Sequence, residues 1–250
     1  MYPVAVLAGG LGTRMARRTG PRLPKALLEV AGRPFIDVKL AQLAAEGVTR
    51  VVLLLGHGAE AIAVHVGDGA TYGLHLEIVP DGEVLLGTGG AVRRGLPDLG
   101  EVFWVTYGDT YLTVPMAEVE EVFRRSGRQG LMTVFRNCDA WDSSNVALRE
   151  GLVAEYRKGA APGTYEYIDY GMSILTAGAF APFPPGTPFD LARVLQSLIA
   201  AGELAAFEVE ERFYEIGSEA GYQATEACLR AAETKARARA QTGERSDGQD

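Results

Sequence analysis

The most constraining feature of this chain is a short apolar run that opens directly into a glycine-dense loop. Residues 4–8 are all apolar, and Gly9, Gly10 and Gly12 follow at once. A continuous apolar run bounded by glycines is typical of a strand buried on both faces of a parallel sheet. A glycine-rich loop at the carboxyl end of such a strand lets backbone amides crowd around an anion. The feature therefore predicts an open α/β sheet that binds a polyphosphate at this edge.

Length, composition and charge narrow the class of protein. The 250 residues are 47% hydrophobic, which is enough for one sizeable core and favours one domain. The net charge of −8 argues against a broad basic face, so we expect no nucleic-acid partner. No apolar run approaches the roughly 20 residues that span a bilayer, and no signal-peptide pattern opens the chain. We therefore expect no membrane partner and a cytoplasmic location.

Strand and helix patterns alternate along most of the chain. Strands are predicted at residues 4–8, 51–55, 74–79, 102–107, 131–135, 171–175 and 204–208, and helices at 34–47, 58–66, 91–96, 115–125 and 189–201. This rhythm predicts an α/β fold with a doubly wound, mostly parallel sheet and helices on both faces. Residues 137–170 depart from it in short polar and aromatic pieces, which predict a small antiparallel elaboration over the substrate end of the sheet.

The end of the chain has a different composition. A final helix is predicted to about Ala232, with Ser218 as its N-cap. From residue 235 the sequence is charged and polar, which predicts disorder. The expected organisation is one domain at residues 1–234 and a tail at 235–250.

The first glycine loop fits neither of two common phosphate motifs. It lacks the Gly-Lys-Ser/Thr ending of a P-loop. If Gly10 and Gly12 are the first pair of a dinucleotide fingerprint, Met15 stands where the third glycine belongs. The loop does deliver two cations, Arg14 and Lys25, to a chain that is acidic as a whole.

With these cations the motif resembles a known family. Residues 7–14 read LAGGLGTR and Pro24-Lys25 follows, which is similar to the signature of the sugar-1-phosphate nucleotidylyltransferases. Within that family the chain is most similar to bacterial heptose 1-phosphate guanylyltransferases and N-acetylmuramate 1-phosphate uridylyltransferases. Four further segments carry the likeness: LGTGGA at 86–91, YGD at 107–109, YRK at 156–158 and FYEIGS at 213–218. The resemblance extends over about residues 4–232.

The family's fold and activity are what this resemblance implies. We expect a Rossmann-like nucleotidyltransferase fold and transfer of a nucleoside monophosphate from a nucleoside triphosphate to a sugar 1-phosphate. The sugar phosphate is already an anionic nucleophile, so the reaction needs alignment and charge neutralisation rather than a side-chain nucleophile. GTP and UTP are the favoured nucleotides on this basis. The oligomeric state stays open, with a homodimer as one candidate.

The resemblance also implies roles for individual residues. The catalytic set is Arg14, Lys25, Asp109 and Lys158. The nucleotide-binding set is Leu7, Ala8, Gly9, Gly10, Gly12, Thr13, Arg14, Lys25, Gly87, Thr88, Gly89 and Gly108. The sugar-binding set is Asn145, Lys158, Asp169 and Gly171. Asp109 and Glu215 would hold Mg²⁺, which prefers hard oxygen ligands.

Two other functions stay open at this point. Glu215 stands where the family usually has aspartate, which leaves open a catalytically weak module that binds nucleotide sugars in a regulatory or scaffold role. A nicotinamide-dependent oxidoreductase is the second alternative, and Met15 at the third glycine position counts against it.

Overall fold

The computed structural model describes the chain except for residues 11–14, 16–17, 19–22 and 244–250. Its central strands are β1 (Val4–Leu7), β4 (Arg50–Leu55), β5 (His75–Pro80), β6 (Val102–Tyr107), β8 (Gly130–Arg136), β9 (Val146–Arg149), β10 (Leu152–Tyr156), β11 (Tyr167–Thr176) and β12 (Leu204–Val209). They form a 9-stranded sheet in the order β5-β4-β1-β6-β11-β8-β12-β10-β9. Four small strands lie outside it: β2 (Glu29–Val30), β3 (Arg33–Pro34), β7 (Thr110–Tyr111) and β13 (Tyr214–Glu215).

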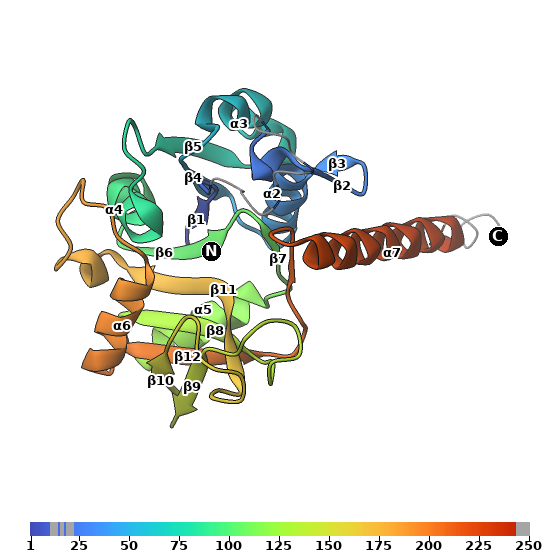
Figure 1. The fold of residues 1–250 in the computed structure, drawn as a ribbon. Coiled ribbons are helices and arrows are strands. Elements are labelled where there is room, and N and C mark those ends of the chain that lie inside the picture. The colour runs from blue at the N-terminus through green and yellow to red at the C-terminus, as the bar shows by residue number, and fades with distance from the viewer. Residues whose placement is uncertain (11–14, 16–17, 19–22, 244–250) are drawn as a thin grey trace.

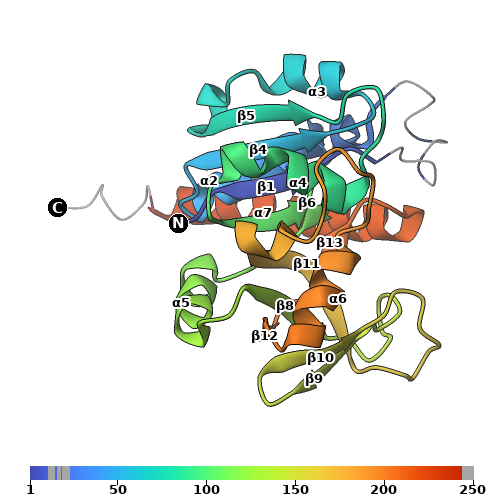
Figure 2. The same ribbon diagram turned by 90° about the vertical axis from the view of Figure 1, so that its left-hand side faces the viewer.

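Helices cover both faces of this sheet. They are α2 (Phe35–Ala45), α3 (Ala59–Val66), α4 (Gly87–Leu99), α5 (Met116–Ser126), α6 (Ala192–Ala201) and α7 (Glu219–Gly243). Helices α4 and α6 pack on one face and α2 and α5 on the other (Figures 1 and 2). The α/β, doubly wound fold predicted from the sequence is confirmed. None of the helices in the described part of the chain has the length and apolar content needed to cross a membrane.

The first part of the sheet is parallel, as predicted. Strand β1 pairs in parallel with β4 on one side and β6 on the other, and β4 pairs in parallel with β5. Only β10 and β11 run against the other strands. The strand order turns around between β1 and β6, because β4 and β5 continue to one side of β1 and β6 lies on the other. Ligands in such sheets bind beyond the strand ends at this switch point.

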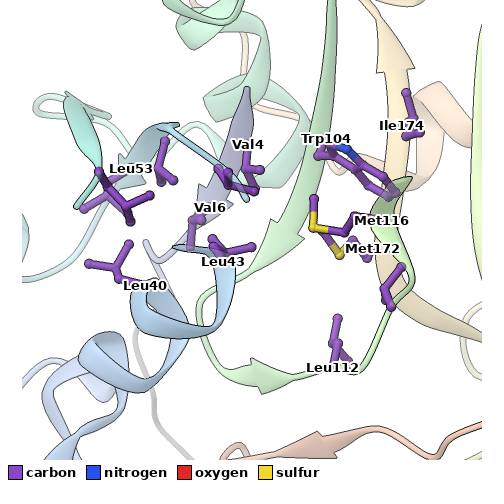
Figure 3. Close-up of a cluster of buried hydrophobic side chains, with 14 of the residues drawn as sticks. Val4, Val6, Leu40, Leu43, Leu53, Trp104, Leu112, Met116, Met172 and Ile174 are labelled. Atoms are coloured by element: carbon purple, nitrogen blue, oxygen red, sulfur yellow. The ribbon is translucent and has the colours of Figure 1, made fainter. Parts of the chain in front are cut away.

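Alternating residues of β1 supply both halves of the core. Val4 and Val6 belong to a cluster that includes Leu40 and Leu43 of α2 and extends to Trp104 on β6 (Figure 3). Their neighbours Ala5 and Leu7 face the opposite cluster, which includes residues of α4 and α6. Because all four residues of β1 are buried, this strand is anchored from both sides, and Gly9 and Gly10 lie just beyond its carboxyl end.

Helix α4 begins earlier than the sequence predicts. The prediction started the helix at residue 91, since glycines are poor helix formers, but the structure begins it at Gly87. A Cβ on Gly89 would lie 2.3 Å from the Phe189 ring, and a Cβ on Gly90 would lie 2.9 Å from Thr187 O. The glycines are therefore required by tight packing against the segment before α6, and this packing outweighs their low helix propensity.

Two predicted boundaries differ in the middle of the chain. The two pieces predicted at 165–170 and 171–175 are one strand, β11, with an irregular register between Asp169 and Ser173. The elaboration at 137–170 is antiparallel as predicted, but its strands β9 and β10 extend the central sheet at its edge. Pairing with an already formed sheet edge satisfies backbone groups that a separate hairpin would leave exposed.

The tail prediction is also wrong in part. Helix α7 continues to Gly243, well past residue 235, and Figure 1 shows it projecting from the body of the molecule. Alanine, arginine and lysine dominate this segment and are among the better helix formers, so its polar composition does not stop the helix. Residues 244–250 lie outside the described part of the chain.

We expect the free energy of unfolding to fall by about 2–5 kcal/mol in Leu53→Ala, because this substitution leaves a cavity in the core. Leu53 is 0% exposed on β4. Val64→Ala is the control, since Val64 is 80% exposed on α3 and should change stability by less than about 0.5 kcal/mol. Urea unfolding of both variants checks this. Equal losses in the two variants would contradict the placement of β4 at the centre of the core.

Candidate active site

A cavity of about 440 Å³ lies at the carboxyl ends of the parallel strands. It is lined by Leu7, Ala8, Gly9, Gly10, Met15, Lys25, Ala26, Leu54, Asp81, Leu85, Gly87, Thr88, Ala91, Tyr107, Gly108, Asp109 and Gly217. Nine residues of the predicted nucleotide set or metal pair line it: Leu7, Ala8, Gly9, Gly10, Lys25, Gly87, Thr88, Gly108 and Asp109. Gly89 does not, and Gly12, Thr13 and Arg14 lie outside the described residues.

Two glycines allow the first loop to cross its neighbour at close range. A Cβ on Gly9 would lie 2.7 Å from Gly56 N, and a Cβ on Gly56 would lie 2.7 Å from Gly9 O. Across this crossing the His57 N–H donates to Gly9 O at 3.2 Å. Gly10 differs, because a Cβ there would meet no described atom within 4 Å. Packing against the described residues therefore does not require glycine at residue 10, which lines the cavity.

Lys25 and Asp109 meet at the cavity wall. Lys25 begins the 3₁₀ helix η2 (Lys25–Leu27), and Asp109 follows the end of β6. Lys25 Nζ donates to Asp109 Oδ2 at 2.6 Å, and the two side chains are 13% and 38% exposed. No described residue donates a hydrogen bond to the other oxygen, Asp109 Oδ1. The pair brings a cation and a partly free carboxylate to the place where both are predicted.

The first turn of α4 offers backbone donors to the same cavity. Gly89 and Gly90 N–H both donate to Phe189 O, at 2.9 and 3.3 Å, so these two amides are already occupied. Within the described residues the amides of Gly87 and Thr88 have no such acceptor, and both residues line the cavity. A helix N-terminus with unpaired N–H groups favours anions. The available donors are thus at residues 87–88, both of which belong to the predicted nucleotide set, whereas the amide of Gly89 in the same set is occupied.

Glu215 is engaged at the start of α7. Its Oε2 accepts from the Gly217 N–H and, at 3.1 Å, from the Ser218 N–H, while Oε1 accepts from Ser218 Oγ at 2.5 Å. Ser218 Oγ accepts in turn from the Gly221 N–H at 3.0 Å, which confirms Ser218 as the N-cap. Both oxygens of Glu215 therefore satisfy groups that begin the helix.

These contacts bear on the predicted magnesium site. Within the described part of the chain, no group of three or more His, Cys, Asp or Glu side chains could hold a metal. Mg²⁺ usually takes one or two carboxylates and completes its shell with phosphates and water. Asp109, with Oδ1 open at the cavity, fits such a site. Glu215 is less suited as a ligand, because both of its oxygens already accept hydrogen bonds at the start of α7.

The four predicted sugar-binding residues do not line the cavity. Asn145 Oδ1 accepts from the Asp169 N–H at 2.9 Å, and Asp169 Oδ1 accepts from the Gly171 N–H at 3.0 Å. These bonds stabilise the irregular part of β11, where Gly171 has a φ of +93°. Lys158 Nζ donates to both carboxylate oxygens of Asp190, at 2.9 and 3.0 Å. All four thus have structural partners in this state.

Tyr107 nevertheless connects the predicted sugar-binding residues to the cavity. Tyr107 lines the cavity. Burial raises the pKa of its hydroxyl, and the negative charges of Asp169, Asp190 and Asp109 raise it further. Burial also raises the pKa of Asp169, against opposing hydrogen bonds from Gly171 and Tyr156 and the charge of Lys158. The charges of Asp169 and Asp190 therefore act on the side of the cavity that Tyr107 lines.

Sequence reasoning missed a buried lysine beneath this site. Lys39 on α2 is 1% exposed, and its Nζ donates to Thr106 Oγ1 at 3.1 Å. Thr106 Oγ1 donates to Gly171 O at 3.1 Å, so one chain of hydrogen bonds links α2, β6 and β11. Burial lowers the pKa of Lys39 to about 7, although the charge of Asp109 opposes this. No signal in the sequence marks Lys39, since a lysine in a helix is normally solvated.

Known proteins are similar to this chain in sequence and in fold. The profile of the MobA-like NTP transferase domain matches residues 4–158. N-acetylmuramate alpha-1-phosphate uridylyltransferase of Caulobacter vibrioides is 30% identical over 234 residues, which are 90% of this chain and 95% of that protein. Bifunctional protein GlmU of Heliobacterium modesticaldum is 38% identical over 130 residues, and the match covers 50% of this chain and 26% of that protein. HddC from Yersinia pseudotuberculosis, complexed with GMP-PN, has the same fold with a TM-score of 0.74, 23% identity and coverage of 92% of this chain and 100% of that chain.

Replacement of Lys39 should stabilise the protein in a pH-dependent way. The folded-state pKa of about 7 lies below the ordinary value of 10.5, so the unfolded chain binds a proton that the folded chain does not between these two values. Stability therefore falls as the pH drops from about 10.5 to 7, and the full cost is present below pH 7. We expect Lys39→Met to gain about 1–4 kcal/mol at pH 6 and much less at pH 10.

Urea unfolding at both pH values measures this difference. Lys235→Met is the control, because Lys235 is exposed on α7 and its replacement should change stability equally at the two pH values. A gain for Lys39→Met that does not depend on pH would show that burial does not destabilise the Lys39 ammonium.

Glu215→Ala should lower stability by about 1–2 kcal/mol, which is typical for loss of a helix cap. We expect the same loss in EDTA and in Mg²⁺ without nucleotide, measured by thermal unfolding. Glu118→Ala is the control, since Glu118 is exposed in the first turn of α5. If the variant is fully stable in EDTA but loses stabilisation by Mg²⁺, Glu215 is a metal ligand after all.

Proposed function

This chain belongs to the MobA-like NTP transferase family, and we propose that it transfers a nucleoside monophosphate from a nucleoside triphosphate to a sugar 1-phosphate. The observation that carries the proposal is the cavity at the switch point of the sheet. It gathers the bare backbone of Gly10, the donors of Gly87 and Thr88 and the Lys25–Asp109 pair. Such a set can hold a polyphosphate by backbone donors and one cation.

The proposed reaction is an in-line displacement at the α-phosphorus. An oxygen of the sugar phosphate forms the new bond to this phosphorus, the bond to the β-phosphate oxygen breaks, and pyrophosphate leaves with the electron pair. During this exchange negative charge builds up on the leaving pyrophosphate and is spread over the oxygens of the transferring group, so a fixed cation beside these oxygens lowers the barrier. Lys25 is the described residue suited to this role, because its ammonium is held at the cavity wall by Asp109. Arg14 is proposed to neutralise the leaving pyrophosphate.

Mg²⁺ is part of the proposal. When bound, the ion supplies positive charge to the phosphates. Asp109 would hold it through the open Oδ1, and the phosphates would provide further ligands. In this proposal Glu215 acts on the site only indirectly, because it fixes the turn before α7 that carries the cavity residue Gly217.

The sugar would lie on the Tyr107 side of the cavity. Asp169, Asp190 and Lys158 gather there, and Lys158 is free to change partner because it is half exposed beside Asp190. We propose that Lys158 contacts the sugar phosphate and that Asp169 accepts from a sugar hydroxyl, as carboxylates do. GTP and UTP are the candidate nucleotides at this stage.

Asp109→Asn should reduce pyrophosphate release by at least about 100-fold, because the site loses the carboxylate that anchors Lys25 and Mg²⁺. The assay combines four nucleoside triphosphates with several sugar 1-phosphates, with and without Mg²⁺. Asp68→Asn is the control, since Asp68 is exposed in the turn after α3 and should leave the rate unchanged. Unchanged turnover in Asp109→Asn would remove Asp109 from the mechanism. The absence of product with every substrate pair in the unmodified protein would favour a nucleotide-sugar-binding module.

A further inference from the structure

A buried ammonium beneath the cavity has no role in the reaction described above. Lys39 on α2 is 1% exposed. An ammonium has three N–H donors, and among the described residues only Thr106 Oγ1, at 3.1 Å, accepts from Lys39 Nζ. Asp109 forms its ion pair with Lys25 and acts on Lys39 only through its charge. Because a lysine is almost never fully buried unless it is paired, packing alone does not account for Lys39.

The immediate surroundings of Lys39 are neutral. Thr106 on β6 and Gly171 O on β11 continue its hydrogen-bond chain, with 3.1 Å at each step. The apolar cluster on this face of the sheet includes Leu40, Leu43, Trp104, Leu112, Met116 and Met172 (Figure 3). A charge in such surroundings is poorly screened by water and salt, so it acts over a longer distance than a charge at the surface.

Other acidic side chains on this face are engaged with partners of their own. Asp37, on the same helix, is hydrogen-bonded by two side chains, at 2.6 and 2.7 Å. Glu120 on α5 accepts from the Trp104 indole at 3.0 Å. The 3₁₀ helix η2, which packs on α2, brings the Lys25–Asp109 pair to this side of the sheet. Asp109 is therefore the carboxylate whose charge reaches Lys39.

Lys39 is close enough to the cavity to act on a ligand there. Its partner Thr106 immediately precedes Tyr107, which lines the cavity. An electrostatic interaction is mutual, so the charge of Lys39 reaches Asp109 and whatever binds beside Asp109. In the proposed reaction the phosphates bind at this place, because Lys25 and Asp109 meet there.

We propose that Lys39 is a positioning residue for the triphosphate: its buried charge attracts the phosphates to the Lys25–Asp109 end of the cavity from behind β6, without touching them. This inference rests on the proposed function. A nucleoside triphosphate is anionic also as its Mg²⁺ complex, so the attraction keeps its sign when the metal is bound. Coupling between two binding equilibria is reciprocal, so the bound phosphates stabilise the ammonium in return. Lys39 therefore destabilises the nucleotide complex less than the empty protein.

The titration of Lys39 makes this attraction measurable. Because the pKa of Lys39 is about 7, the side chain in the free protein is mostly charged at about pH 6.5 and mostly neutral at about pH 8.5. A ligand that prefers the charged form raises this pKa, so its affinity falls as the pH rises through the range. A rise of about one unit limits the gain in affinity to about tenfold, of which about fivefold falls between these two pH values.

Titration calorimetry of the full chain in Mg²⁺ measures the dissociation constants of GTP and of UTP at the two pH values. In the unmodified protein we expect both nucleotides to bind about fivefold more tightly at the lower pH. Lys39→Gln keeps an N–H donor for Thr106 Oγ1 but carries no charge. We expect this variant to bind equally at both pH values and to match the unmodified protein within about twofold at the higher pH.

Lys235→Met is the control, because it removes an exposed lysine on α7 and should keep the fivefold difference. Lys39→Met, which is expected to be more stable than the unmodified protein, replaces Lys39→Gln if that variant does not fold. An unmodified protein without pH dependence overturns the role of Lys39, and so does a neutral variant with the same pH dependence. A neutral variant that is weaker by one factor at both pH values shows a packing role and also overturns it.

These outcomes leave the proposed function intact, because they concern only the dependence of nucleotide affinity on Lys39. Failure of both GTP and UTP to bind to the unmodified protein at either pH overturns the proposed function, and the role of Lys39 with it.

Discussion

The contact between Lys25 and Asp109 is the interaction on which the site depends. It joins the segment after the glycine loop of β1 to the end of β6, the two strands on either side of the switch point. The ammonium and the carboxylate, held at 2.6 Å, offset each other's charge at the cavity wall. A triphosphate and its metal ion can therefore enter a site whose own charges are already balanced.

The sequence predicted the parts of this site that depend on local rules. Buried strands appear as apolar runs, glycine loops follow them, and the carboxyl ends of parallel strands meet at one edge. These rules placed Gly9 and Gly10 at this edge, the family resemblance added Lys25 and Asp109, and all four line one cavity. These rules concern the backbone geometry of each segment, which depends on its own residues rather than on contacts with distant segments.

The remaining features depend on contacts between distant segments. Nothing near Lys39 in the sequence indicates that α2 is pressed against Thr106. Asp190 pairs with Lys158 only because the loop before α6 returns to β10. The early start of α4 requires Phe189, about a hundred residues later, to accept from Gly89. Hydrophobic periodicity and helix propensity contain no information on such pairings. The sequence therefore could not show which amides and carboxylates make hydrogen bonds within the protein and which are left for a ligand.

The crossing of Gly9 and Gly56 has a consequence for how this protein can be altered. The two backbones touch with no side chain between them, so any shift of the loop after β4 is passed directly to Gly9. Grafting a longer loop at this point to broaden substrate choice would displace both at once. Variation is better tolerated on the far side of the sheet, at the β9–β10 edge, where added residues extend into solvent and leave the crossing untouched.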